Sequence, residues 1–180
     1  MIICSIYETD AVAAERSFSS TQVELPAALR AAVLKAAAAI PDEDLATDGR
    51  EDRPHVTVKY GLHTSRAADV APLLAKEPPV TLTLGKTAIF AAKPGGPDYD
   101  VVYVAVNSPA LHRLNTKIAK GTPVTDTHPT YQPHATLAYV KAGRGARYAG
   151  LTSLQGRSAV VDTVVFSSKD KTETLIRLGG

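Results

Sequence analysis

An α+β fold with antiparallel sheets is the class that this sequence of 180 residues predicts. Each helix-like stretch lies between strand-like stretches, and the strand-like stretches are short and come in hairpin-like pairs. This pattern is more typical of antiparallel sheets than of a doubly wound parallel sheet. No long linker divides the chain, so we expect a single domain at residues 19–180 after an N-terminal extension at residues 1–18.

The first half of the chain alternates between strand and helix patterns. Pro26 stands at a first helical position, and the alanine-rich stretch after it favours a helix that Pro41 ends. Ser65 is a plausible N-cap for a second helix. The expected elements are a strand at 19–25, a helix at 26–40, a charged surface loop at 42–53, a strand at 55–62 and a helix at 65–76.

The second half repeats this alternation. The segment at 93–98, KPGGPD, is a turn signal between strands, and Ser108-Pro109 is typical of a helix start. The expected elements are strands at 80–84, 88–92 and 99–107, a helix at 108–120, a loop at 121–133, and strands at 134–140, 159–167 and 172–178.

Composition and charge exclude several classes of protein. The 20 Lys and Arg residues exceed the 18 Asp and Glu residues by only two, which is too weak a positive charge for general binding to long nucleic acid. No apolar run is long enough to span a membrane, and the start of the chain lacks the pattern of a signal peptide. The single cysteine, Cys4, excludes an intrachain disulfide. We expect a soluble, cytoplasmic monomer.

One internal repeat carries the functional prediction. Residues 54–60 read PHVTVKY and residues 133–139 read PHATLAY, so both fit P-H-h-T-h-x-Y, in which h is apolar. In a strand, side chains two residues apart share a face, so each motif presents an imidazole beside a hydroxyl. If the two halves pack about a pseudo-two-fold axis, the two pairs face each other across a cleft.

Such a cleft suits phosphodiester cleavage without a metal. One imidazole can take a proton from a nucleophile while the other gives one to a leaving oxygen. The threonine hydroxyls can donate hydrogen bonds to non-bridging phosphate oxygens. Because no acidic ligand pattern accompanies the histidines, we expect neither a metal nor another cofactor.

The paired motifs, HVTV at 55–58 and HATL at 134–137, resemble those of the two-histidine (2H) phosphoesterase superfamily, which includes 2′-5′ RNA ligase-like proteins and cyclic nucleotide phosphodiesterases. The resemblance spans residues 19–178. It implies a bilobal α+β fold in which antiparallel sheets line a central cleft and helices lie outside. It also implies that His55 and His134 form the acid-base pair and that Thr57 and Thr136 hold the phosphate.

Within the superfamily, the segments FSSTQVEL and GREDRPHVTVKYGLH are similar to phage proteins related to the anti-CBASS phosphodiesterase. That resemblance implies cleavage of cyclic oligonucleotide messengers of bacterial antiviral defence in the cytoplasm of a host cell. A cyclic di- or trinucleotide is therefore the first expected substrate. The alternatives are an RNA end with a 2′,3′-cyclic phosphate or a 2′-5′ linkage, a non-catalytic nucleotide-binding sponge, and a structural accessory of a phage particle.

Further side chains are candidates for substrate binding. Lys59 shares a strand face with the first motif, where it could neutralise phosphate, and Gln22 could line the cleft from the first strand. Phe18 or Phe90 could stack on a base. Asp162 interrupts an apolar run and could accept a hydrogen bond from a base amino group.

Another sequence also has the form His-x-Thr. His128-Pro129-Thr130 lies six residues before the second motif. The proline at its middle position suits a loop better than an inner strand. We therefore expect His134, rather than His128, to be the second functional histidine.

Overall fold

The computed structural model describes residues 16–126 and 130–179, which form a nine-stranded antiparallel sheet with helices packed on it. The strands are β1 (Ser19–Glu24), β2 (Leu45–Arg50), β3 (His55–Leu62), β4 (Val80–Phe90), β5 (Tyr99–Asn107), β6 (His134–Lys141), β7 (Ser158–Val161), β8 (Thr163–Ser167) and β9 (Glu173–Arg177). The helices are α1 (Ala27–Ala38), α2 (Ala71–Leu74) and α3 (Pro109–Gly121), and short 3₁₀ turns lie at Asp42–Asp44, Ala67–Asp69 and Gly145–Tyr148.

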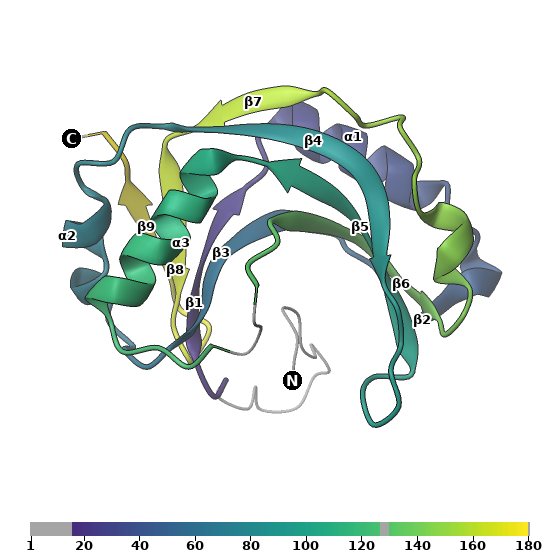
Figure 1. The fold of residues 1–180 in the computed structure, drawn as a ribbon, viewed down its shortest axis with the longest axis horizontal. Helices are drawn as coiled ribbons and strands as arrows, with labels where there is room; N and C mark the ends of the chain where they lie inside the picture. The colour runs from purple at the N-terminus through teal and green to yellow at the C-terminus, as the bar shows by residue number, and fades with distance from the viewer. Residues whose placement is uncertain (1–15, 127–129, 180) are drawn as a thin grey trace.

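The two lobes share one continuous sheet. Its strand order is β7-β4-β5-β6-β3-β1-β8-β9, and β2 pairs with β6 beside this path. In Figure 1 the sheet bends into an arch, with β4, β5 and β6 on the right and β1 and β8 on the left. The expected α+β class with antiparallel pairing is confirmed, and the β3–β6 pair joins the lobes at the middle of the order.

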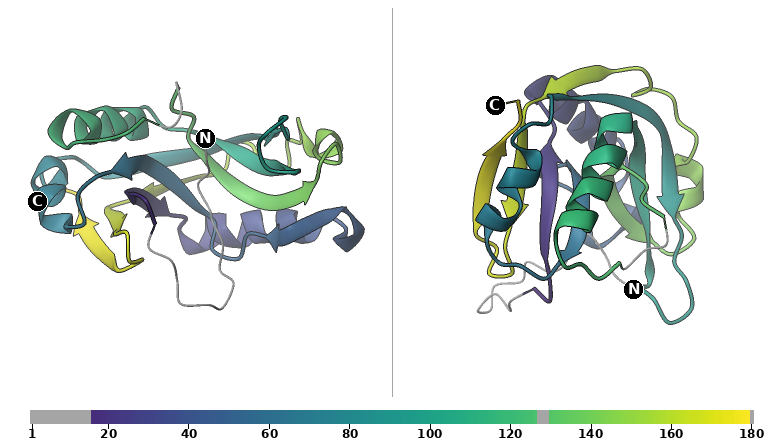
Figure 2. Two further views of the ribbon diagram at one scale, coloured as in Figure 1. Left: turned by 90° about the horizontal axis from the view of Figure 1, so that it is seen from below. Right: turned by 60° about the vertical axis from the view of Figure 1, so that its left-hand side comes forward.

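A strand-helix-strand unit occurs once in each lobe. In the first unit α1 follows β1 and precedes β3, and in the second α3 follows β5 and precedes β6. The strands of each unit pair antiparallel with each other. Each helix also packs on the motif strand of the other lobe, α1 on β6 and α3 on β3. The left view of Figure 2 shows strands lying between α3 and α1, so the helices lie outside as expected.

Apolar side chains from both units merge into one core. Leu29 and Val33 of α1 and Leu111 and Leu114 of α3 are all buried in the same cluster as the inner residues of the middle strands. Ser108 caps α3 by accepting a hydrogen bond from the Leu111 N–H at 3.3 Å. The shared core fixes the two middle strands relative to each other.

The expected surface loop at 42–53 is wrong over much of its length. Residues Leu45–Arg50 form β2, an irregular strand along β6. A short strand that is only partly buried can carry charged residues, so the sequence of this segment did not distinguish β2 from a loop. Arg50 also donates hydrogen bonds from its guanidinium to the carbonyls of Ala37 and Ile40, which satisfies the end of α1.

The expected helix at 65–76 is mostly wrong as well. The chain forms a 3₁₀ turn and then the four-residue α2, and Ser65 caps neither. Instead the Thr64 hydroxyl donates a hydrogen bond to the Asp69 carboxylate at 2.5 Å, which makes a tight polar turn. Local side-chain hydrogen bonds of this kind compete with helix formation.

Two strand boundaries also differ from expectation. The separate strands at 80–84 and 88–92 are one strand, β4, with an irregularity between Leu84 and Thr87. The single strand at 159–167 is two strands that diverge at Asp162. Of these, β7 pairs with β4 and β8 pairs with β1 near the other edge of the sheet.

Residues 1–15, including Cys4, and His128 lie outside the described residues. Among the described residues, no helix has the length and apolar character needed to span a membrane.

Candidate active site

The two motifs lie on neighbouring strands at the centre of the sheet. The antiparallel pairing of β3 and β6 puts Val56 and Ala135, the middle residues of the His-x-Thr triplets, opposite each other. This register places the histidine of each motif opposite the threonine of the other. Because residues opposite each other in a sheet point to the same face, all four side chains share one face.

These four side chains line one small hollow in the concave surface. The residues around it are Glu51, His55, Thr57, His134 and Thr136. Val56 and Ala135, between them in sequence, are fully buried on the other face. The sequence prediction that the two His/Thr pairs meet in space agrees with this arrangement. The two pairs meet side by side on one sheet rather than across a gap between two sheets.

Both imidazoles are held in the same way. His55 Nδ1 lies 3.0 Å from the carbonyl oxygen of Arg53, and His134 Nδ1 lies 2.7 Å from that of Gln132. A carbonyl oxygen only accepts, so Nδ1 carries a proton in each ring. Nε2 is then the nitrogen whose protonation can change during a reaction. The carbonyl in each case belongs to the residue before the motif proline, so the repeat sets the tautomer as well as the position.

Strand β1 flanks the first motif. Its residues Gln22 and Glu24 lie opposite Thr57 and His55 in the β1–β3 register, so they share the face of the hollow. The Gln22 amide donates a hydrogen bond to the Glu24 carboxylate at 3.1 Å. The structure therefore brings Gln22 next to the His/Thr pair, where a substrate-binding role remains a prediction.

Strand β5 flanks the second motif in the matching way. Tyr103 lies opposite Thr136, and Ala105 lies opposite His134. Tyr103 and Ala105 thus occupy the positions that Gln22 and Glu24 occupy in the other lobe. The two halves of the site share their motif residues and differ in the side chains beside them.

Glu51 is a site residue that the sequence reasoning missed. It ends the irregular segment after β2, where its N–H donates a hydrogen bond to Leu137 O at 2.9 Å and its carboxylate accepts one from Arg53 N–H at 3.1 Å. Burial raises the pKa of the Glu51 carboxyl, and the nearby imidazole of His55 acts in the opposite direction. The repeat did not indicate it, because the position that corresponds to Glu51 before the second motif is Thr130.

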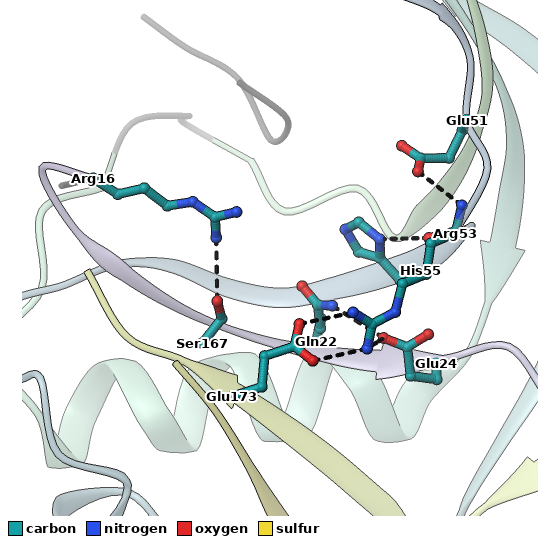
Figure 3. A network of polar contacts seen from close by, with 8 residues as sticks. All are labelled: Arg16, Gln22, Glu24, Glu51, Arg53, His55, Ser167 and Glu173. Carbon is teal, nitrogen blue, oxygen red and sulfur yellow. Dashed lines mark hydrogen bonds and ion pairs between the residues drawn. The ribbon is translucent and has the colours of Figure 1, made fainter. Parts of the chain in front are cut away.

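A polar network holds the segment before His55. The Arg53 guanidinium donates to both carboxylate oxygens of Glu173 at 3.1 and 2.8 Å and lies 3.2 Å from Glu24 (Figure 3). The hydrogen bonds that Arg53 donates to Glu173 raise the pKa of Arg53. The same residue supplies the carbonyl that orients His55. In Figure 3 Arg16 forms a separate contact with Ser167.

Aromatic side chains surround the other histidine. Phe90 stacks on Tyr103 with ring centres 4.3 Å apart, and both rings lie 5.0 Å from the His134 ring. Phe90 is 38% exposed, whereas Tyr103 is buried, and burial raises the pKa of the Tyr103 phenol. The sequence analysis named Phe90 as a possible stacking residue and did not single out Tyr103.

Lys59 is enclosed rather than open to the hollow. Its ammonium pairs with the Asp126 carboxylate, and its side chain is buried. The loop with Asp126 is held on β3 by Thr125 N–H, which donates to Gly61 O at 2.9 Å. Gly61 has φ +91°, and a Cβ there would lie 2.0 Å from Thr125 O, so only glycine allows this approach. Phosphate binding by Lys59 stays a prediction.

The other two candidates lie outside the group that lines the hollow. Phe18 stacks on His63 with ring centres 5.5 Å apart and meets Tyr60 edge-on. Asp162 accepts a hydrogen bond from Thr163 and pairs with Arg177 at 3.4 Å, where the chain crosses from β7 to β8. The structure brings neither residue to the two histidines.

Within the part of the chain that the structure describes, no three His, Cys, Asp or Glu side chains gather in a way that could hold a metal ion. Independence from metal stays a prediction that a chelator can test.

A curved antiparallel sheet with a His-x-Thr motif on each of its two middle strands is the arrangement that defines the two-histidine phosphoesterases, and the predicted resemblance to that superfamily is confirmed. The chain belongs to the 2′-5′ RNA ligase superfamily, whose family model matches residues 65–172. The match includes the second motif and begins after the first. A comparison with curated proteins gives no match.

Several solved structures share the fold over most of this chain. TT0787 of Thermus thermophilus is 20% identical with a TM-score of 0.68, and the match covers 91% of this chain and 98% of that one. Escherichia coli LigT complexed with 3′-AMP is 21% identical with a TM-score of 0.56, covering 91% and 95%. Kluyveromyces marxianus Usb1 with uridine monophosphate is 12% identical with a TM-score of 0.56, covering 89% and 97%.

Proposed function

We propose that the chain is a metal-independent phosphodiesterase that cleaves 3′-5′ phosphodiester bonds of nucleotides. One observation carries the proposal: two imidazoles and two hydroxyls, from motifs 79 residues apart, line a single hollow. An acid-base pair beside two neutral hydrogen-bond donors is what cleavage of a phosphodiester needs. We also propose that residues 19–180 work as one bilobal domain, because each lobe supplies half of this site.

The reaction follows from the protonation states of the two rings. One histidine, neutral at Nε2, takes the proton from a ribose 2′-OH or a water, and the oxygen forms a bond to phosphorus. The bond from phosphorus to the 5′-oxygen breaks, and the other histidine gives its Nε2 proton to that oxygen. Thr57 and Thr136 donate to the non-bridging oxygens, where negative charge accumulates.

A cyclic di- or trinucleotide is the first proposed substrate, and its cleavage in the host cytoplasm would serve a phage as a counter-defence against CBASS signalling. The support is the likeness of the segments around β1 and β3 to phage proteins of that kind. The exposed face of Phe90, stacked on Tyr103 beside His134, offers a surface for a base of such a nucleotide. Stacking of a base on an aromatic side chain contributes about 1–3 kcal/mol.

An RNA end with a 2′,3′-cyclic phosphate or a 2′-5′ linkage is the second candidate. The family match favours it, since the family is named for 2′-5′ RNA ligases. LigT is recorded with 3′-AMP and Usb1 with uridine monophosphate, both of which are single nucleotides. A non-catalytic sponge is the weakest alternative, because a pure binder has no need of two proton-transfer groups.

Product analysis separates these candidates. The purified protein is incubated with cyclic di- and trinucleotides, RNA ends with a 2′,3′-cyclic phosphate and 2′-5′-linked dinucleotides, and the products are resolved by chromatography and mass spectrometry. Linear products from the cyclic nucleotides support the first candidate, and turnover of only the RNA substrates supports the second. Tight binding without any product identifies a sponge and refutes the phosphodiesterase.

A further inference from the structure

Each motif strand carries a bulge directly after its threonine. Consecutive residues of β1 lie opposite Thr57 and Lys59, which leaves Val58 without an opposite residue. The register of β6 with β5 skips Leu137, the residue after Thr136, in the same way. A bulge bends its strand, increases the local twist and can redirect a side chain, and bulges are common beside active sites. Both bulges therefore lie where they can set the direction of a threonine hydroxyl.

The carbonyl of a bulged residue needs a hydrogen-bond donor from outside the regular ladder. Val58 and Leu137 are buried, and a buried carbonyl without a donor destabilises the folded state. The Val58 carbonyl accepts a hydrogen bond from the Asn115 side-chain amide at 2.6 Å, and the Leu137 carbonyl accepts one from the N–H of Glu51 at 2.9 Å. Asn115 lies on α3 and Glu51 lies before β3, so each bulge is held from the other half of the chain.

Tyr131 gives the first motif a second contact with the other lobe. Its hydroxyl donates a hydrogen bond to the carbonyl of Thr57 at 2.8 Å. Its ring meets the ring of His112 on α3 edge-on, with ring centres 5.2 Å apart. Tyr131 stands three residues before His134. The main chain of Thr57 is therefore tied to the segment that leads into the second motif.

We propose that Asn115 and Tyr131 are positioning residues, which hold the bulge after Thr57 in the shape that directs the threonine hydroxyl into the hollow. This inference rests on the proposed function. Two consecutive carbonyls, those of Thr57 and Val58, accept hydrogen bonds from these two side chains, whereas a main-chain N–H holds the bulge of the other motif. Substitution can therefore disturb the first threonine while the second keeps its support.

Loss of the Asn115 amide should lower turnover with little change in KM. We expect Asn115→Ala to lower kcat about 5- to 50-fold and to change KM less than about threefold, because a small displacement of a catalytic group can cost about 100-fold. Asn115→Leu keeps much of the bulk but has no donor, so it should fail like Asn115→Ala. Recovery by Asn115→Leu would show that bulk, rather than the hydrogen bond, is what matters, and would overturn the role of the amide.

The assay uses whichever of cyclic di-AMP, ApA and 2′,3′-cyclic AMP the wild type turns over fastest, and circular dichroism ensures that folded proteins are compared. Thr116→Ala changes an exposed residue of the same helix and is the matched control. It should leave kcat and KM unchanged.

Tyr131→Phe is the milder variant, because it removes the hydroxyl and keeps the ring on His112. It should lower kcat about two- to tenfold, which is the range that one hydrogen bond contributes. It takes the place of Asn115→Ala in every comparison if the latter does not fold. Normal kcat in a folded Asn115→Ala or Tyr131→Phe protein would overturn the positioning role of that residue.

Combination with the threonine variants shows through which residue Asn115 acts. In a protein that already carries Thr57→Val, Asn115→Ala should lower kcat less than about twofold further, because the hydroxyl that it positions is gone. In a Thr136→Val protein the loss of about 5- to 50-fold should appear in full. Equal further losses in both proteins would indicate a general loosening of the fold and overturn the proposal. A wild type that turns over none of the three substrates refutes the proposed function, and the positioning role falls with it.

Discussion

The β3 half and the β6 half of the site show how far a repeat determines a structure. Both motifs start a strand after a proline, both histidines bind the carbonyl two residues upstream, and both threonines point into the same hollow. The neighbours differ, with carboxylates beside His55 and aromatic rings beside His134. The residues that the two motifs share give both halves the same reactive groups, whereas the neighbouring residues that differ give the two halves different environments.

Removal of either imidazole should cause the largest loss of turnover. We expect His55→Ala and His134→Ala each to lower turnover of the natural diester by at least about 100-fold, because acid-base catalysis contributes about 10²–10⁴. The double variant should lose little more than either single one, because the pair acts as a unit. Steady-state kinetics on folded protein measures this.

His63→Ala is the matched control for these variants. His63 stacks on Phe18 and its Nε2 lies 2.8 Å from the Thr125 hydroxyl, so it belongs to another cluster. Its loss should leave turnover nearly unchanged. Normal turnover by His55→Ala or by His134→Ala would refute the acid-base pair.

The two threonines should behave alike across the repeat. Thr57→Val and Thr136→Val keep the strand shape but remove a donor to the phosphate. Each should cost roughly 2–4 kcal/mol in the transition state, mainly as a loss of turnover, by analogy with an oxyanion hole. Thr→Ser should retain much of the activity. Equal failure of the Ser and Val variants would mean that the threonines only pack.

Phe90→Ala should affect one half of the site alone. Loss of a stacking surface worth about 1–3 kcal/mol should raise KM for a nucleotide by roughly 5- to 150-fold and leave turnover less affected. Val160→Ala, which removes an exposed apolar side chain on the edge strand β7, should leave KM unchanged. An unchanged KM in Phe90→Ala would place the base elsewhere.

The stability of Glu51→Gln should show the smallest effect. Because burial raises the pKa of Glu51, the folded state favours the protonated carboxyl. That contribution is present below the ordinary carboxyl pKa and is lost as the pH rises through the folded value, so the ionised group adds no stability at neutral pH. Chemical denaturation at neutral pH should show that Glu51→Gln is no less stable than the wild type. A clear loss would mean that the carboxylate holds the fold.

The alternation of side chains along a strand, together with the internal repeat, predicted the four site residues that the two motifs share. His55, Thr57, His134 and Thr136 all came from one short pattern, because a strand places alternate residues on one face. Glu51 and Tyr103 could not be found in this way. Glu51 lies beside the irregular β2, whose charged sequence looks like a loop, and Tyr103 reaches the site through strand pairing between segments distant in sequence.

Contacts between segments distant in sequence also explain some of the errors in the predicted fold. The split at Asp162 sends two consecutive strands to opposite sides of the sheet, and nothing local distinguishes that crossing from an interrupted strand. The helix at 65–76 failed because Thr64 and Asp69 stabilise a turn in place of a helical start. Local patterns thus predicted the elements of each unit better than the connections between the lobes.

The pH dependence of kcat/KM in excess chelator tests the central claim most directly. One imidazole must be neutral and the other charged, so the rate should rise and then fall with pH, with both limbs belonging to the coupled pair. The account predicts this bell-shaped profile with full activity in EDTA. Activity that disappears in EDTA and returns with one divalent ion, or a rate that changes in one direction only, would contradict a metal-free histidine pair.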